Sequence, residues 1–153
     1  MPEKETIERA REDASEGKSP STQAGEFVRE EMHHVREGKH GAASTKQAIA
    51  IGLSKTRRAG VKLQVPAKGK ASPETIKQAQ RETREGQSHF ASRPSPTRSR
   101  AVSQALRKEG HSAASHRSLS QYARAVAKKR GPAARSKSAV KASQTRSRGR
   151  KRS

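Results

Sequence analysis

The chain has 153 residues, of which 28% are hydrophobic and 32% are charged, and its formal net charge at pH 7 is +21. It contains no cysteine, which excludes disulfide bonds and thiolate metal sites, and no apolar run approaches the ~18 residues that a membrane-spanning helix needs. Because ordering a residue costs about 1–2 kcal/mol of backbone entropy and few large side chains can be buried, we expect no compact full-length core.

The expected fold class is mainly α: a short helical hairpin, marginal helices around it and a disordered basic tail. Runs of helix-forming residues end at Glu-Gly pairs or at glycines after basic turns, and several begin at a Ser-Pro pair or a capping serine. These signals predict helices at residues 3–16, 22–37, 45–59, 73–85, 96–109 and 116–130, with boundaries defined to ~2–4 residues.

Residues 1–21 form an acidic, mixed N-terminal segment. Residues 1–37 contain six Lys/Arg and ten Asp/Glu, whereas residues 38–153 contain 29 Lys/Arg and four Glu. The first residues lack the basic-then-apolar layout of a secretory signal, so we expect a cytoplasmic protein. The acidic segment could fold back on basic regions and weaken their non-specific contacts.

The expected hairpin module spans residues 22–65 and contains the helices predicted at 22–37 and 45–59. Each helix has apolar residues at the spacing of one helical face. The second helix begins at Ser44, which forms an S-x-x-Q capping box with Gln47. The apolar positions are Ala24, Phe27, Val28, Met32 (or Glu31) and Val35 in the first helix, and Ala48, Ile49, Gly52 and Leu53 in the second.

The rest of the chain divides into three parts. Residues 66–110 are predicted to be a linker with marginal helices. Residues 111–130 are predicted to be a helix that partly repeats the hairpin, because a shift of 71 residues aligns HGAAS at 40–44 with HSAAS at 111–115. A duplication and the chance recurrence of similar helix ends both explain this match. Residues 131–153 are the expected disordered basic tail.

The hairpin module carries a resemblance. The stretch EFVREEMHHVREGKHG at residues 26–41, followed by STKQAIAIGLSKTRRAG at residues 44–60, resembles a family of small basic bacterial proteins of unknown function. The resemblance covers roughly residues 15–65. Some members are labelled plasmid stabilisation proteins and others DNA-binding proteins, so it implies a role with nucleic acid. It brings no catalytic or binding residues to this chain.

Several cations are placed where they could meet a phosphate backbone. Lys39, His40 and Lys46 surround the N-terminus of helix 45–59, where unpaired amides attract phosphate, although an ordinary solvated helix cap has the same groups. After Glu109 the chain has thirteen Lys/Arg and no acid, which is typical of an interaction tail. The predicted nucleic-acid-binding residues are Lys39, His40, Lys46, Lys55, Arg57, Arg58, Arg117, Lys128, Lys129, Arg130, Arg135, Lys137, Arg146, Arg148, Arg150, Lys151 and Arg152.

The sequence does not indicate that bases are read. Asn is absent, aromatic residues make up 2% of the chain, and no recognition-helix pattern is present. If about eight cations met phosphates, log K would fall with log salt at a slope of about −7.

Four residues of helix 22–37 are spaced like metal ligands, namely Glu30, His33, His34 and Glu37. A catalytic zinc site normally has three protein ligands in a shaped pocket. Since no pocket-forming core is expected, we predict no metal site and no cofactor. The chain also lacks a P-loop, a G-x-S-x-G motif and a cysteine nucleophile, so we expect no enzyme activity.

These observations predict a small basic accessory protein that binds DNA non-specifically through phosphates, of the nucleoid-associated or plasmid-maintenance type. Duplex DNA is the expected partner, with RNA as the other polymer that the same charges permit, and the hairpin could self-associate. The alternatives are a mostly disordered stress or hydration protein with no nucleic-acid role, and an RNA- or ribosome-associated basic protein.

Overall fold

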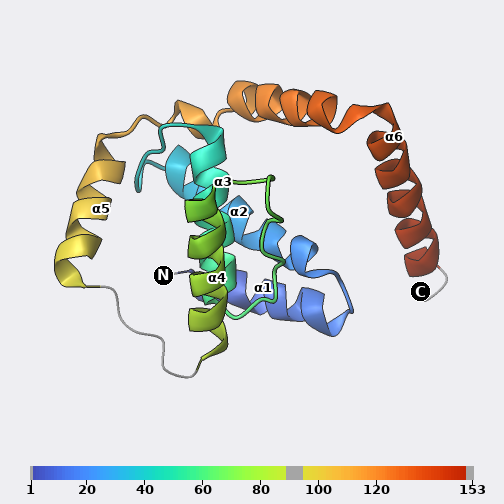
Figure 1. Cartoon of the computed structure of the whole chain (residues 1–153), viewed down its shortest axis with the longest axis horizontal. Coiled ribbons are helices and arrows are strands. Elements are labelled where there is room, and N and C mark those ends of the chain that lie inside the picture. The colour runs from blue at the N-terminus through green and yellow to red at the C-terminus, as the bar shows by residue number, and fades with distance from the viewer. Residues whose placement is uncertain (1, 89–94, 151–153) are drawn as a thin grey trace. The chain divides into compact units, whose positions relative to one another are not determined.

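The computed structural model describes residues 2–88 and 95–150, with side chains up to residue 147. Two compact units are present, Met1–Ser115 and His116–Ser153. Across residues 2–88 and 95–150, the helices include none with an apolar stretch of membrane-spanning length. The described elements are the helices α1 (Lys4–Ser15), α2 (Pro20–Arg36), α3 (Thr45–Arg58), α4 (Pro73–Gln87) and α5 (Pro96–Lys108), the 3-10 turn η1 (Ser112–Ala114) and helix α6 (His116–Arg150) (Figure 1).

The predicted helix ends of the first unit are confirmed to within two residues, because their signals act locally. The Gln47 N–H donates to Ser44 Oγ at the start of α3 (3.1 Å), and the Thr75 N–H donates to Ser72 Oγ at the start of α4 (3.2 Å). After the end of α2 the backbone turns at Gly38 with a φ of 75°, which an L side chain rarely adopts.

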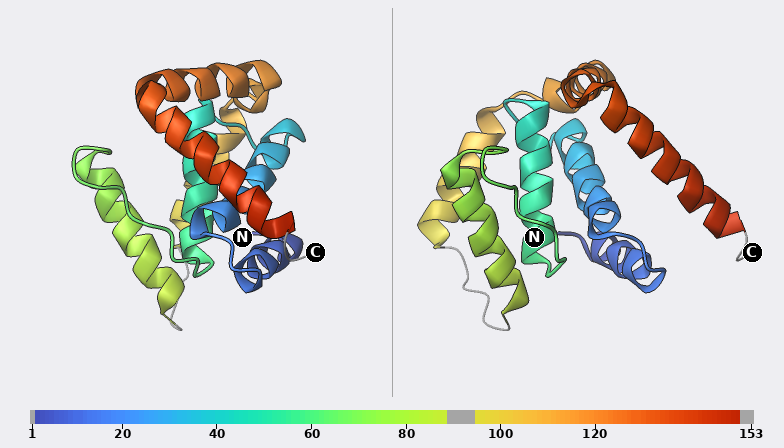
Figure 2. Two further views of the ribbon diagram at one scale, coloured as in Figure 1. Left: turned by 90° about the vertical axis from the view of Figure 1, so that its right-hand side faces the viewer. Right: turned by 45° about the vertical axis from the view of Figure 1, so that its right-hand side comes forward.

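The core of the first unit lies where α2 packs on both α1 and α3, while α4 packs on the other side of α3 (Figure 2). Phe27 and Val35 of α2 and Ala48 of α3 are fully buried. Helices α2 and α3 approach closely at Gly52, where an added Cβ would lie 2.8 Å from Val28 Cα.

The expectation that the chain lacks a compact core is therefore wrong. It assumed that a core needs many large apolar side chains. Here alanines fill most of the core positions, and they allow helix backbones to approach closely at little cost in side-chain entropy. Buried polar residues complete the contacts: Glu82 of α4 is 3% exposed and pairs with Arg58 of α3 at 3.2 Å.

The expectation of a disordered basic tail is also wrong, because α6 continues from His116 to Arg150. The backbone is non-helical at Gly131 (φ 76°, ψ 168°), and Pro132 then occupies the first turn of the second half of the helix. Low apolar content limits burial but does not prevent local helix formation, and this stretch is rich in Ala, Arg and Lys, which have high intrinsic helix propensity.

Residues 106–115 contact the loop between α2 and α3. The helix-end patterns in the sequence did not predict this contact. The Gly41 N–H donates to the Leu106 carbonyl (2.8 Å) and the Ala42 N–H to the Gly110 carbonyl (3.0 Å). On η1, the Ala114 carbonyl accepts from Arg36 Nε (2.8 Å). The loop that follows α2 is thus held in place by backbone hydrogen bonds that it donates to distant residues.

Candidate functional site

A cluster of charged side chains is buried between α2 and α3. Glu30 and Glu31 of α2 are 5% and 0% exposed. Lys55 of α3 places Nζ 3.0 Å from Glu30 Oε1 and 2.7 Å from Glu31 Oε2. Burial disfavours the charged lysine, but the two carboxylates outweigh it and raise the pKa of Lys55. One ammonium group thus serves two buried carboxylates.

Glu3, the residue before α1, joins this cluster from the N-terminal side. Its backbone N–H donates to Glu30 Oε2 (3.0 Å), while its own carboxylate accepts from His34 Nε2 (2.8 Å) and from Lys39 Nζ (3.1 Å). The hydrogen bond from His34, with that from Lys39, lowers the pKa of Glu3 to about 2. For Glu30, burial acts to raise the pKa, but contacts with Thr6, Glu3 and Lys55 outweigh it and lower the pKa.

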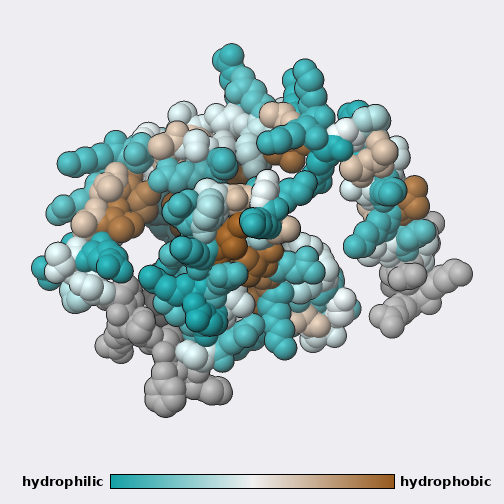
Figure 3. Space-filling view, viewed as in Figure 1, coloured by the Kyte–Doolittle hydropathy of each residue, from teal (hydrophilic) through white to brown (hydrophobic). Residues whose placement is uncertain are grey.

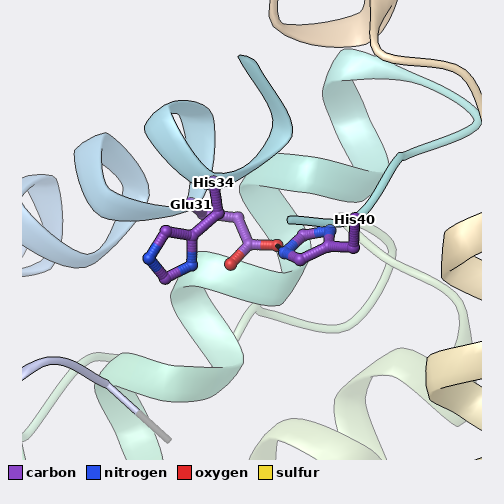
Figure 4. A group of neighbouring side chains, drawn as sticks. All are labelled: Glu31, His34 and His40. Carbon is purple, nitrogen blue, oxygen red and sulfur yellow. Dashed lines mark ion pairs between the residues drawn. The ribbon is translucent and has the colours of Figure 1, made fainter. Parts of the chain in front are cut away.

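Two histidines lie against the Glu31 carboxylate from opposite sides (Figure 4). His40 Nε2 lies 3.2 Å from Glu31 Oε1, and the rings of His34 and His40 meet edge to face with centroids 6.1 Å apart. One ligand atom from each of the three residues lies within 4.8 Å of the others. Among the described residues, neither oxygen of Glu31 accepts a hydrogen bond of good geometry, despite the nearby cations.

The loop geometry fixes the position of His40. Its ring donates from Nδ1 to the Gly41 carbonyl (3.1 Å), and the Gly41 backbone is itself held by Leu106. Any Cβ at Gly41 would overlap the Glu109 carbonyl oxygen, so only glycine fits this approach. A polar pocket of about 180 Å³ lies between α1 and α2 and is lined by Glu3, Glu30 and His34 of the cluster.

Most of the predicted nucleic-acid-binding residues of the hairpin are engaged within the first unit. Lys39 pairs with Glu3 and Glu37, and Arg58 pairs with Glu82. Arg57 is only 7% exposed and donates to the Leu53 carbonyl. The remaining three are His40 and Lys55, which face Glu31, and Lys46, which is exposed.

The predicted contacts on α6 are exposed wherever their side chains are described. The exposed residues are Arg117, Lys128, Lys129, Arg130, Arg135, Lys137 and Arg146, and α6 also exposes Arg124 and Lys141, which we did not predict. The side chains of Arg148 and Arg150 lie outside the described set, as do Lys151 and Arg152 entirely. Along the first half of α6, Arg117, Arg124 and Lys128 lie opposite the half-buried Leu119, Tyr122 and Val126.

The four residues of α2 that are spaced like metal ligands do not share one environment: two are buried and two are exposed. His33 and Glu37 are exposed, whereas His34 is buried with Nδ1 3.9 Å from Glu30 Oε1. Sequence reasoning missed Glu31 and the approach of His40. A signal for Glu31 was present, since it shares the apolar face of its helix with Ala24, Phe27 and Val35, where a carboxylate needs a buried partner.

Residues 19–69 of the chain match the model of a family described as a family of unknown function (DUF6496). The match covers α2, α3 and the loop between them, including Glu31, His34, His40 and Lys55, and it stops far short of α6. No curated protein and no solved structure matches the chain. The expected resemblance to a family of unknown function is therefore confirmed for the helical hairpin.

Proposed function

We propose that the protein binds nucleic acid, duplex DNA in the first place, through phosphate contacts made by α6, and acts as a nucleoid-associated or plasmid-maintenance accessory protein. The observation that carries this proposal is the contrast in charge between the two units. Residues 1–115 have 22 Lys/Arg and 14 Asp/Glu, a net of 22 − 14 = +8, whereas residues 116–153 have 13 Lys/Arg and no acid, a net of +13.

In the first unit, many basic side chains have carboxylate partners. Lys18, Lys39, Lys55 and Arg58 all lie within 3.2 Å of an acidic oxygen. Helix α6 has no acidic side chain of its own, and its described Lys and Arg side chains are exposed. A polyanion would therefore meet these charges with no competing carboxylate on the same helix, and each phosphate contact would release condensed counterions.

The aromatic residues support duplex over single-stranded nucleic acid. Single-strand binding relies on exposed aromatic rings on which bases stack. Phe27 is fully buried and Tyr122 is half-buried, while Phe90 lies outside the described residues. Hydrogen-bonded reading of adenine by Asn is excluded by the absence of that residue. Binding to the phosphate backbone of a duplex requires neither Asn nor exposed aromatic rings, which agrees with this composition.

The test compares two triple variants of the full-length chain in fluorescence anisotropy titrations with unrelated duplexes. Changing Lys128, Lys129 and Arg130 to Gln keeps residues that favour helix and removes three exposed charges. The matched control changes Lys62, Lys68 and Lys70, three exposed lysines of the first unit, to Gln.

The proposal predicts that the α6 variant loses more than tenfold in affinity for every duplex, and that the control loses much less. Equal losses in both variants would show that only total charge matters and would remove the role of α6. Preferential binding of structured RNA in competition with duplex DNA would replace DNA with RNA as the partner.

A further inference from the structure

We propose that Glu31, His34 and His40 form a binding site for a divalent transition-metal ion, with zinc as the best match to the ligands. Two imidazoles and one carboxylate are a donor set that zinc commonly takes, and three protein ligands leave a fourth position for water. This site shares no residue with the phosphate contacts proposed for α6.

The spacing of the ligand atoms agrees with a tetrahedral ion. Zinc bonds of ~2.0–2.1 Å to nitrogen and oxygen place two ligands of a tetrahedron about 3.3 Å apart. His40 Nε2 and Glu31 Oε1 are 3.2 Å apart, and the third ligand atom lies within 4.8 Å of both.

The hydrogen bonds of the two histidines determine which ring nitrogens face Glu31. His34 uses Nε2 to donate to the Glu3 carboxylate, and His40 uses Nδ1 to donate to the Gly41 carbonyl. In a neutral imidazole the other nitrogen carries a lone pair. Figure 4 shows a His34 nitrogen turned toward the Glu31 carboxylate, and because Nε2 is engaged with Glu3 this nitrogen is Nδ1.

The two lone pairs therefore face the Glu31 carboxylate from opposite sides, and one ligand atom of each residue lies within 4.8 Å of the others, so a cation among them would meet three donors. The partners on the outer nitrogens, a carboxylate and a backbone carbonyl, are those that orient zinc-bound histidines in proteins. In the described structure Glu31 is fully buried, and neither of its oxygens accepts a well-formed hydrogen bond. A buried carboxylate in this state is costly unless it is paired.

Lys55 alone does not neutralise the buried Glu31 carboxylate. Its ammonium group lies beside Glu31 Oε2 and is shared with Glu30, so one positive charge faces two buried negative charges. Glu31 Oε1 is on the side of His40 and is the oxygen available to a metal ion. Lys55 would remain on Oε2 and hold the carboxylate in position.

The fold supplies both rigidity and access. Glu31 and His34 are three residues apart on α2, which places them on one side of the helix. His40 is held by the loop whose backbone pairs with Leu106 and Gly110. Of the three ligands, His34 lines the pocket of about 180 Å³ between α1 and α2, so the site has one ligand beside a solvent-filled hollow.

The test uses the full-length protein, freed of metal with a chelator, at pH 8, where free imidazole is neutral. Isothermal titration calorimetry with Zn²⁺ should give one site per chain, and addition of Co²⁺ should give the intense visible absorption of a tetrahedral complex. Thermal unfolding should shift to higher temperature with added Zn²⁺, because an ion that binds only the folded chain stabilises it.

Matched variants assign the site. His40→Ala should weaken Zn²⁺ binding by at least 100-fold, and Glu31→Gln should do the same while keeping the side-chain shape. His33→Ala removes an exposed histidine of the same helix and should leave affinity unchanged. Far-UV circular dichroism of each variant checks that the helices remain.

Two results would overturn the proposal. One is the absence of stoichiometric Zn²⁺ binding to the folded wild-type chain. The other is an equal loss of affinity in His33→Ala and His40→Ala, which would mean that zinc binds surface histidines without a specific site.

Discussion

Lys55 of α3 and Glu31 of α2 form an ion pair inside the first unit, with Nζ 2.7 Å from Oε2. The carboxylate is fully buried, and the lysine side chain is 19% exposed. This contact joins the two helices of the hairpin at the point where His34, His40 and Glu30 also meet. The Lys55 ammonium group, which the sequence predicts to bind phosphate, is thus paired with a carboxylate of the same protein.

Removing the positive charge of Lys55 should lower the free energy of unfolding of the hairpin. Lys55→Met keeps the length of the side chain but leaves Glu30 and Glu31 as buried carboxylates without their shared partner. Breaking a buried pair in this way costs about 3–5 kcal/mol. Urea unfolding followed by circular dichroism measures the loss, and Lys46→Met, an exposed change on the same helix, should alter stability by less than ~0.5 kcal/mol. Equal stability of the two variants would contradict the pairing described above.

The close approach of α2 and α3 gives a second test, because it requires a residue without Cβ. Gly52→Ala places a methyl group 2.8 Å from Val28 Cα, a backbone atom that cannot move without shifting α2. We expect a loss of about 1–3 kcal/mol in the free energy of unfolding. The control is Gly25→Ala within α2, where no described atom beyond the adjacent residues and the nearby backbone of the same helix lies within 4 Å of the new Cβ.

In that control the change removes the cost of glycine in a helix and should stabilise the protein by roughly 0.5–1 kcal/mol. Opposite signs for the two Gly→Ala changes are therefore the expected result. A stabilising effect at both positions would mean that the helices are farther apart than described.

The helical state of the C-terminal unit gives a third test. Deleting residues 132–153 removes the second half of α6 and should lower the total helical circular dichroism signal at 222 nm in proportion to the helical residues lost. The thermal midpoint of the first unit should stay unchanged, because that unit has its own core. A deletion that leaves the total helical signal unchanged would restore the disordered tail that composition alone suggests.

Local features of the fold could be predicted from the sequence, and long-range features could not. Ser44, Ser72 and Gly38 mark helix ends through contacts with their own neighbours, so their roles are visible in the sequence. The contact of Gly41 with Leu106 joins residues 65 positions apart and depends on packing. No local pattern contains that information.

The candidate metal site follows the same division. The spacing of Glu31 and His34 on α2 is evident from the sequence, but the approach of His40 depends on a loop that is held by the end of α5 and the segment after it. The sequence pattern offers Glu31 only as an alternative to Met32 on the apolar face, and predicts no role for it. Its importance comes from the burial of both oxygens, which depends on α3 and the loop.

The surface of the molecule agrees with a protein that works through charge. Hydrophilic residues cover most of the face shown in Figure 3, and apolar residues appear there as smaller patches. Among the described large hydrophobic residues, Val102 and Val140 are more than half exposed. Exposed cations of α6 lie on a helix that holds them at fixed spacing, which a disordered tail would not do.

The most direct test of the proposed function is the salt dependence of duplex binding by the full-length chain, compared with the chain that lacks residues 132–153. With about eight phosphate contacts, log K should fall against log salt concentration with a slope of about −7, and the deletion should flatten that slope by several units. Equal slopes for the two proteins, or no binding to duplexes at low salt, would contradict the assignment of phosphate binding to α6.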